Sequence, residues 1–265
     1  MSDKFDREQV RSFWEKQAVA HGDSPSASWS DHRVIEKEID EITARLEDGN
    51  SVLDVGCANG FSSIQYAARR KIHLRGVDYV GEMIEQARAR AERYSHELEG
   101  SVSFEAGDIT GLNDPDGNYD KVIVTRVIIN LGNWERQLVG LREAIRVLKP
   151  GGTLLLSEAT VQGWTRLNQF RREWNLPEIS MPPFNNYLDQ DRVIDSVSAE
   201  LTLRELVDFS STYYVGTRVL KPLLIESLGA QIDVADAGME WNRWFAALPA
   251  WGDYGVQRLF VFDKR

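Results

Sequence analysis

The sequence predicts an α/β domain built on a doubly wound parallel sheet, and three observations support this fold class. Short apolar runs that end in a polar residue or a glycine alternate with amphipathic helical segments between residues 50 and 160. Val52 to Val55 leads directly into a turn bracketed by Gly56 and Gly60, where the backbone can approach a ligand closely. The 265 residues are enough to bury a full core in one domain with an insertion.

The elements of this core follow one another in a regular order. Each expected helix has apolar positions spaced by three and four residues, and each expected strand is short. The last helix of the series ends at Lys149-Pro150-Gly151-Gly152, a combination that terminates helices. The expected elements are strand 52–55, helix 61–70, strand 73–78, helix 79–98, strand 102–106, strand 119–125, helix 134–148, strand 153–158 and a sixth strand 203–209.

The glycine turn indicates a nucleoside ligand rather than a dinucleotide. The dinucleotide fingerprint places glycines two and five positions after the first, where this chain has Ala58 and Phe61. A phenylalanine at the third place blocks the close helix approach that a pyrophosphate requires. Asp78 ends the second strand and is placed to accept hydrogen bonds from both ribose hydroxyls. A smaller adenosyl ligand therefore fits the turn better, although the turn alone leaves a nicotinamide oxidoreductase open.

Five motifs together resemble the class I S-adenosylmethionine-dependent methyltransferase family. They are VLDVGCANG, GVDYVGEM, AGDIT, YDKVIVT and RVLKPGGTLLLSE, in the order and spacing of the family, and they cover about residues 50 to 160. The resemblance implies a Rossmann-like sheet of seven strands, mostly parallel with an antiparallel last strand, and helices on both faces. It also implies that S-adenosylmethionine binds across the carboxyl ends of the first four strands and leaves as S-adenosylhomocysteine.

The resemblance assigns the cofactor-binding residues by position. The residues of the first turn surround the methionine portion, and Asp78 holds the ribose. Either Tyr79 or Met83 covers one face of the adenine, while Asp108 and Ile109 meet its edge. The remaining assignments are Asp54, Gly56, Cys57 and Gly60 at the methionine portion, with backbone contacts from Thr125 and Arg126 at the sulfonium.

Composition limits the partners of the chain. The 31 basic and 41 acidic side chains give a net charge of −10, which disfavours nonspecific binding to nucleic acid or an anionic membrane. Cys57 is the only cysteine, so an intrachain disulfide is impossible and we expect a cytoplasmic protein. The first six residues contain no apolar signal core, and we expect no membrane insertion. No Cys and His spacing predicts a metal site, and the sequence does not indicate the oligomeric state.

Segments outside the core are expected to decide the acceptor, since members of the family share the cofactor half. We expect a single domain in which 1–48 is a helical cap, 49–160 the core, 161–200 a substrate-side insertion, and 201–265 the last strands and part of a lid. Helices are expected at 8–22, 34–46 and 164–174. Trp29 lies on a loop of the cap, where it either fills the core or covers the cofactor.

Several polar and aromatic residues of these segments are candidates for binding the acceptor. A looser resemblance connects residues 126–131 and 210–220 with methyltransferases of polysaccharide and sugar-nucleotide pathways. It implies a carbohydrate whose hydroxyls are held by amide, tyrosine and arginine side chains, and an anionic group paired with Arg126 or Arg218. For Arg218 a simple ion pair is an equally good account. The candidates are Asn130, Asn186, Tyr187, Tyr213, Tyr214 and Arg218.

An alcohol must lose its proton during methyl transfer, so a base is expected near the acceptor. Glu158, at the end of the fifth strand, is the first candidate, and His21 is the second. The sequence thus predicts an O-methyltransferase of a hydroxylated small molecule, such as a saccharide or a sugar-linked intermediate. The alternatives are a methyltransferase of a carboxylate, an amine or a phenol, and an adenosyl-binding protein without catalysis.

Overall fold

The computed structural model describes residues 7–229 and 236–265. Its centre is a seven-stranded sheet of order β3-β2-β1-β4-β5-β7-β6. Strands β1 to β5 pair in parallel, whereas β7 pairs antiparallel with both β5 and β6. The expected fold class, including the antiparallel last strand, is confirmed. The strands are β1 Ser51–Val55, β2 His73–Asp78, β3 Ser101–Ala106, β4 Tyr119–Thr125, β5 Leu148–Ala159, β6 Leu201–Val207 and β7 Gln257–Lys264.

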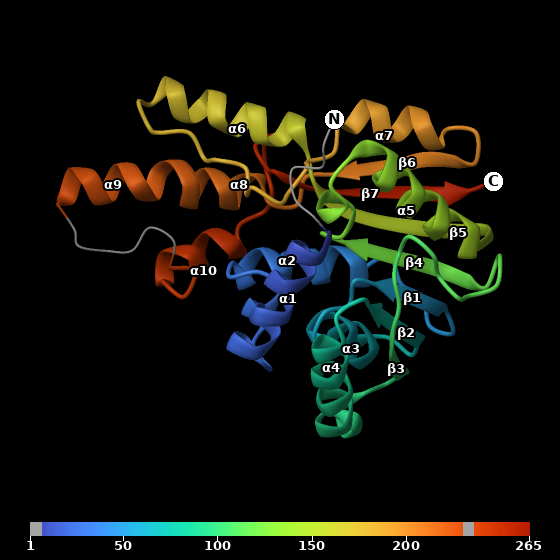
Figure 1. Ribbon diagram of the computed structural model, residues 1–265. Helices are drawn as coiled ribbons and strands as arrows, with labels where there is room; N and C mark the ends of the chain where they lie inside the picture. Colours follow the sequence, from blue (N-terminus) through green and yellow to red (C-terminus); the bar gives the residue numbers. More distant parts are fainter. Residues whose placement is uncertain (1–6, 230–235) are drawn as a thin grey trace.

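The helices cover both faces of the sheet and extend beyond one end of it (Figure 1). The longer ones are α1 Arg7–His21, α2 His32–Thr43, α3 Phe61–Arg69, α4 Gly81–Arg93, α5 Trp134–Val147, α6 Val161–Glu173, α7 Gln190–Val197, α9 Lys221–Leu228 and α10 Glu240–Ala247. The shorter ones are η1 Pro25–Ala27, η2 Ser95–Glu97, η3 Ile128–Asn130, α8 Ser211–Tyr214 and the π-helix η4 Val215–Leu220.

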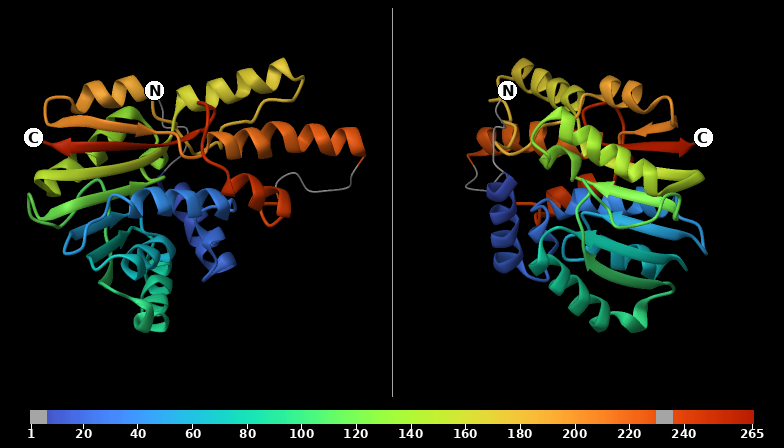
Figure 2. Two further views of the ribbon diagram at one scale, coloured as in Figure 1. Left: turned by 180° about the vertical axis from the view of Figure 1, so that it is seen from behind. Right: turned by 45° about the vertical axis from the view of Figure 1, so that its right-hand side comes forward.

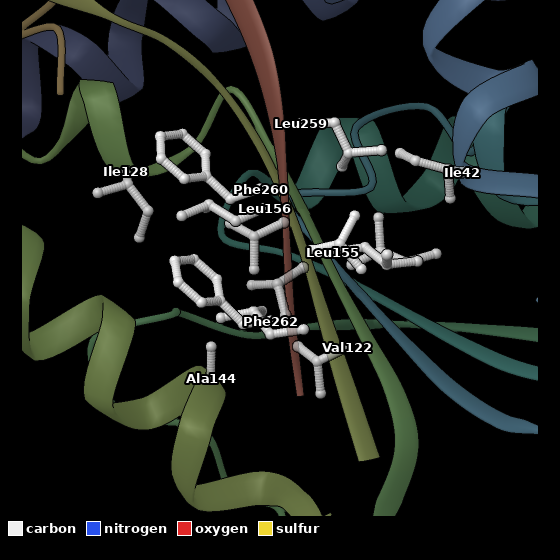
Figure 3. Close-up of a cluster of buried hydrophobic side chains, with 14 of the residues drawn as sticks. Ile42, Val122, Ile128, Ala144, Leu155, Leu156, Leu259, Phe260 and Phe262 are labelled. Atoms are coloured by element: carbon white, nitrogen blue, oxygen red, sulfur yellow. The ribbon is translucent and has the colours of Figure 1, made fainter. Parts of the chain in front are cut away.

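The core lies on both faces of the central strands because neighbouring residues of a strand point to opposite sides. Phe260 pairs with Leu156, and Figure 3 shows both on the side of the sheet where Ala144 of α5 lies. Leu259 points to the other face, toward Ile42 of α2 (Figure 3). All five side chains are almost completely buried. Such strands, covered on both faces, explain the continuous apolar runs of the sequence.

The helical additions lie beyond the carboxyl ends of the parallel strands, where a ligand of this fold class binds. Figure 1 shows α1, α6 and the run α8 to α10 at this end, and the two views of Figure 2 show the same arrangement. Residues 210–220, which lack hydrophobic periodicity, form α8 and the π-helix η4. The remaining elements match the expected ones within a few residues, with four differences in bounds. Helix α2 begins at His32 and α6 at Val161. Helix α4 ends at Arg93 instead of residue 98, and β5 begins at Leu148, so that it contains the Lys-Pro-Gly-Gly segment expected before it. Residues 1–6 of the expected cap lie outside the described part of the chain.

None of the helices in residues 7–229 and 236–265 is long and apolar enough to cross a lipid bilayer.

Candidate functional site

The turn after β1 is packed tightly against the chain that follows β4. Gly56 has φ +74°, and a Cβ built on it would lie 2.1 Å from Cγ2 of Val127. Any side chain at position 56 would therefore push these two segments apart. Since β1 and β4 are neighbours and the strand order reverses between them, this contact lies at the switch point of the sheet.

Asp78 connects the end of β2 to the same turn. Its Oδ2 accepts a hydrogen bond of 3.0 Å from the Ala58 amide, and its Oδ1 accepts one of 2.9 Å from the Val80 amide. Burial raises the pKa of Asp78 to about 6, although these amide hydrogen bonds act to lower it. The carboxylate thus holds the turn, and its remaining lone pairs can accept hydrogen bonds from a ligand.

A cavity lies against this turn, and we call it the turn cavity. It runs from the turn past the ends of β2, β3 and β4, and its empty volume is about 1040 Å³ with the open mouth included. Every residue predicted to bind the cofactor lines it except Gly60 and Trp29. The predicted residues in its wall are Asp54, Gly56, Cys57, Asp78, Tyr79, Met83, Asp108, Ile109, Thr125 and Arg126.

Gly60 and Trp29 do not line the turn cavity in this structure. Gly60 precedes α3 with φ +72°, and a Cβ built on it would meet Ala87 and Phe104 at 3.0 Å. Cζ of Arg126 lies over the Trp29 ring, 5.4 Å from its centroid, in the wall of a second cavity. The assignment of these two residues to the cofactor stays a prediction.

The charge of the turn cavity fits S-adenosylmethionine better than a pyrophosphate. Its two arginines are already paired, Arg7 with Asp108 and Arg126 with Glu38. Burial raises the pKa of Asp54 to about 6, even though Ser63 donates a hydrogen bond of 2.5 Å to its Oδ2. Among the described residues, this lining has unneutralised carboxylates and no spare cation, which favours a ligand that carries positive charge and ribose hydroxyls. Asp54 and Asp78 would hold these two parts, and Tyr79, Met83 and Ile109 would enclose the adenine.

The second cavity adjoins the turn cavity, and we call it the aromatic cavity. The two share Trp14, Ser28, Arg126 and Asn130 in their walls. Six aromatic side chains from four separate segments line the aromatic cavity, together with His21 and several amides. The aromatic residues are Phe13, Trp14, Trp29, Phe184, Tyr187 and Tyr214.

Two amide oxygens in the aromatic cavity have no hydrogen-bond partner. Oδ1 of Asn130 and Oδ1 of Asn185 are buried and unpaired. Asn130 is fixed in place because its Nδ2 donates to the Arg126 carbonyl at 2.7 Å. The loop that carries Asn185 is fixed by a 2.7 Å hydrogen bond from the Asn186 amide to the Ile129 carbonyl. Both oxygens belong to residues that line the aromatic cavity, so a ligand with hydrogen-bond donors is one partner that would satisfy them.

Glu158 does not lie at the mouth of the site, so its assignment as the base is wrong. Its side chain is fully buried, and it lines neither the turn cavity nor the aromatic cavity. Oε1 accepts hydrogen bonds of 2.8 and 2.7 Å from the amides of Val127 and Ile128. Burial raises the pKa of Glu158 to about 8 despite these hydrogen bonds. Its role is to hold the segment that follows β4.

Two of the predicted acceptor residues belong to the protein interior instead. Tyr213 is fully buried; its hydroxyl donates to Oδ1 of Asp31 at 2.8 Å and accepts from Asn242 at 2.9 Å. Arg218 pairs with Asp31 and stacks on Tyr214 at 5.1 Å, so it has no charge to spare for a ligand. The simpler account of Arg218 as an ion pair is the correct one.

The other predicted acceptor residues lie around the cavities. Tyr187, Tyr214 and Asn130 line the aromatic cavity, together with the alternative base His21. Asn186 lies in a neighbouring groove.

Residues of both cavities were not among the predicted site residues. Val10 and Trp14 of α1 line the turn cavity. Phe184 lines the aromatic cavity, and its ring lies 4.6 Å from that of Phe13. The pattern of aromatic residues on α1 and the Pro-Pro-Phe-Asn-Asn run were visible signals. Their distance in sequence concealed that they meet.

Comparison with known proteins gives a consistent result. The family model described as "Methyltransferase domain" matches residues 46–180. The chain is similar to the 27-O-demethylrifamycin SV methyltransferase of Amycolatopsis mediterranei, with 30% identity over 140 residues, 49% of this chain and 48% of that protein. It is also similar to the methyltransferase GfsG of Streptomyces halstedii, with 28% identity over 234 residues, 82% of this chain and 77% of that protein. The chain thus spans about half the length of the first relative.

A solved structure shares the fold over the whole chain. The magnesium protoporphyrin IX methyltransferase from Synechocystis PCC 6803, with bound S-adenosylhomocysteine, superimposes with a TM-score of 0.63 at 15% identity. The similarity covers 98% of this chain and 100% of that one.

The Asp78 carboxylate is expected to contribute directly to cofactor affinity. Asp78→Ala should weaken the binding of S-adenosylhomocysteine by about 1–3 kcal/mol, because charged hydrogen bonds to the ribose are lost. Isothermal titration calorimetry measures this change. Asp191→Ala, which removes an exposed carboxylate of α7, serves as the control and should bind normally. Unchanged affinity in Asp78→Ala would show that the ribose lies elsewhere.

Buried Glu158 is expected to make stability depend on pH. The folded protein keeps this proton up to about pH 8, whereas the unfolded chain releases it near pH 4.5. Between these values the folded state binds more protons, so the free energy of unfolding falls as the pH rises. Glu158→Gln removes this contribution and should lose less stability between pH 5.5 and 8.5 than the unmodified protein.

Urea denaturation at the two pH values tests this expectation. Glu200→Gln changes an exposed carboxylate before β6 and should behave like the unmodified protein. Equal pH dependence in Glu158→Gln and the unmodified protein would contradict the assignment.

Proposed function

Because this chain belongs to the class I S-adenosylmethionine-dependent methyltransferase family, we propose that it methylates a hydroxyl group of a small molecule whose reacting part is neutral. A saccharide or a sugar-linked intermediate is the acceptor that best suits the aromatic cavity. The unpartnered amide oxygens of Asn130 and Asn185 carry this proposal. A buried acceptor without a partner destabilises the protein, and a hydroxyl-bearing ligand supplies the missing donors.

The charges of the aromatic cavity favour an alcohol over an amine or a carboxylate. Among the described residues that line it, none is an aspartate or a glutamate that would hold an ammonium group. Its one arginine, Arg126, pairs with Glu38 and is therefore not available to a carboxylate. Burial acts to lower the pKa of Arg126, but the charge of Glu38 outweighs burial and raises it. Both side chains stay charged, and the ion pair has no net charge.

The two cavities are arranged for direct transfer between their occupants. The bound cofactor supplies an electrophilic methyl group. In this proposal the acceptor lies beside the turn cavity, next to the shared wall of Arg126, Asn130 and Trp14, and α1 contributes residues to both cavities. Trp14 and Phe184, whose ring centroids lie 6.2 Å apart, help to keep water out. Holding the two reactants in one orientation supplies much of the rate enhancement of such a reaction.

His21 is the residue we assign to receive the acceptor proton. It lies at the end of α1 in the wall of the aromatic cavity. The tyrosines of this wall cannot receive the proton, because burial raises the pKa of Tyr187 and of Tyr214 and keeps both phenols protonated. The imidazole of His21 is the remaining side chain of this wall whose chemistry suits a general base.

Several relatives support transfer to oxygen on a small molecule. The Amycolatopsis mediterranei protein is named as the methyltransferase of an O-demethylated rifamycin, and rstn1 of Aspergillus nomiae is named as an O-methyltransferase. The aromatic walls suit the apolar face of a sugar ring, while the amides suit its hydroxyls. A phenol or a polyketide presents a larger apolar face and fewer donors to the amides.

A panel of acceptors tests this function. We expect labelled methyl transfer from S-adenosylmethionine into monosaccharides, sugar phosphates or glycosylated molecules, and none into amines. Asn185→Ala should raise KM about five- to tenfold with little change in kcat, the effect of about one lost hydrogen bond. Asn118→Ala is the matched control, because Asn118 is exposed and lines neither of the two cavities nor the neighbouring groove. Label confined to amines or phenols would overturn the saccharide proposal, and no label in any acceptor would favour a binding protein.

His21→Gln tests the proton acceptor separately. We expect kcat to fall at least about tenfold, because the variant has no imidazole to receive the proton of the acceptor hydroxyl. Cofactor affinity should stay the same. His96→Gln, which changes an exposed histidine of η2, should keep the unmodified kcat. An unchanged kcat in His21→Gln would exclude this histidine as the base.

A further inference from the structure

We propose that a groove beside the two cavities binds an anionic extension of the acceptor through Arg192. This outer groove is lined by Trp134 and Arg136 of α5, Asn185 and Asn186 of the loop before α7, and Arg192 of α7. The extension is a phosphoryl or carboxylate group that carries an oxyanion. The inference rests on the proposed function, because it places the neutral, reacting end of the acceptor in the aromatic cavity.

The outer groove is continuous with both cavities. Asn130 lines the outer groove, the turn cavity and the aromatic cavity. Phe184 and Asn185 line the outer groove and the aromatic cavity. A molecule held by the amides of Asn130 and Asn185 therefore extends into the groove without crossing the protein.

Arg192 is held in a geometry that leaves its donors available. Its Cζ lies 4.2 Å from a ring centroid of Trp134. This cation–π contact uses none of the N–H donors of the guanidinium, which can therefore bind an oxyanion in a bidentate manner. No ion pair joins Arg192 to a carboxylate of the described residues, and the side chain is exposed. Trp134 thus fixes the orientation of an arginine that keeps its charge for a ligand.

The other arginines around the acceptor are committed to partners. Arg126 pairs with Glu38, Arg218 with Asp31, and Arg7 with Asp108. Arg136 also has an interaction within the chain. In a protein with a net charge of −10, an anionic group needs a local cation to overcome the overall field. Arg192 meets this need.

Binding to the protein saturated with S-adenosylhomocysteine tests the inference without catalysis. Isothermal titration compares glucose, glucose 1-phosphate and glucuronic acid as probes. We expect at least one anionic probe to bind about tenfold more tightly than glucose, as charged hydrogen bonds allow. Comparing glucose 1-phosphate with glucuronic acid shows whether the groove prefers a phosphoryl or a carboxylate group. Arg192→Gln should bring the anionic probes to within about twofold of glucose and leave glucose and cofactor affinity unchanged.

Arg142→Gln is the matched control. It removes the same charge from an exposed position of α5 that lines none of the three cavities, and it should keep the preference for the anionic probe. Equal affinity for glucose and both anionic probes, or a preference that survives Arg192→Gln, would overturn the inference. A titration with inorganic phosphate distinguishes failure of this inference from failure of the proposed function. Binding of phosphate that depends on Arg192, without binding of any sugar, would uphold the groove and exclude the saccharide.

Discussion

The close contact between Gly56 and Val127 is the constraint on which the rest of the site depends. It brings the turn after β1 within van der Waals distance of the segment after β4, at the place where the strand order reverses. Both segments are then fixed by buried carboxylates, the turn by Asp78 and the other segment by Glu158. Arg126 and Asn130 lie on the second segment, so the positions of these two residues at the junction of the cavities follow from this contact.

Ion pairs neutralise the buried charges near the cavities, so few of them are available to the acceptor. Glu38 neutralises Arg126 and also accepts a 2.5 Å hydrogen bond from Ser157, beneath the junction of the cavities. Asp31 neutralises Arg218 and connects the cap to α8 and the π-helix. Removing one partner of such a pair leaves an uncompensated buried charge, at a cost of about 3–5 kcal/mol. These pairs therefore define a rigid wall, and the groups left for a ligand are amides and aromatic rings.

The part of the chain that selects the acceptor comes from distant segments. The aromatic cavity combines α1, the loop around Trp29, the loop around Phe184 and the side chain of Tyr214. The loop around Phe184 is held by hydrogen bonds to the segment after β4 and to Gln137 of α5. A change of acceptor among related proteins thus requires changes only in these additions, while the sheet and the turn cavity stay the same.

Within residues 50–160, the order of strands and helices, the glycine turn, and the placement of Asp54, Asp78 and Asp108 near strand ends could all be predicted from the sequence. These features follow from local periodicity and from the rule that parallel strands end at one edge of a sheet. Tertiary structure alone decided which polar residues face a ligand. Glu158 and Arg126 are both close to strand ends, yet packing buried the first and brought the second to the cavities. Side-chain direction, burial and ion pairing depend on residues far apart in sequence, such as Glu38 with Arg126 and Phe13 with Phe184, and no local pattern encodes them.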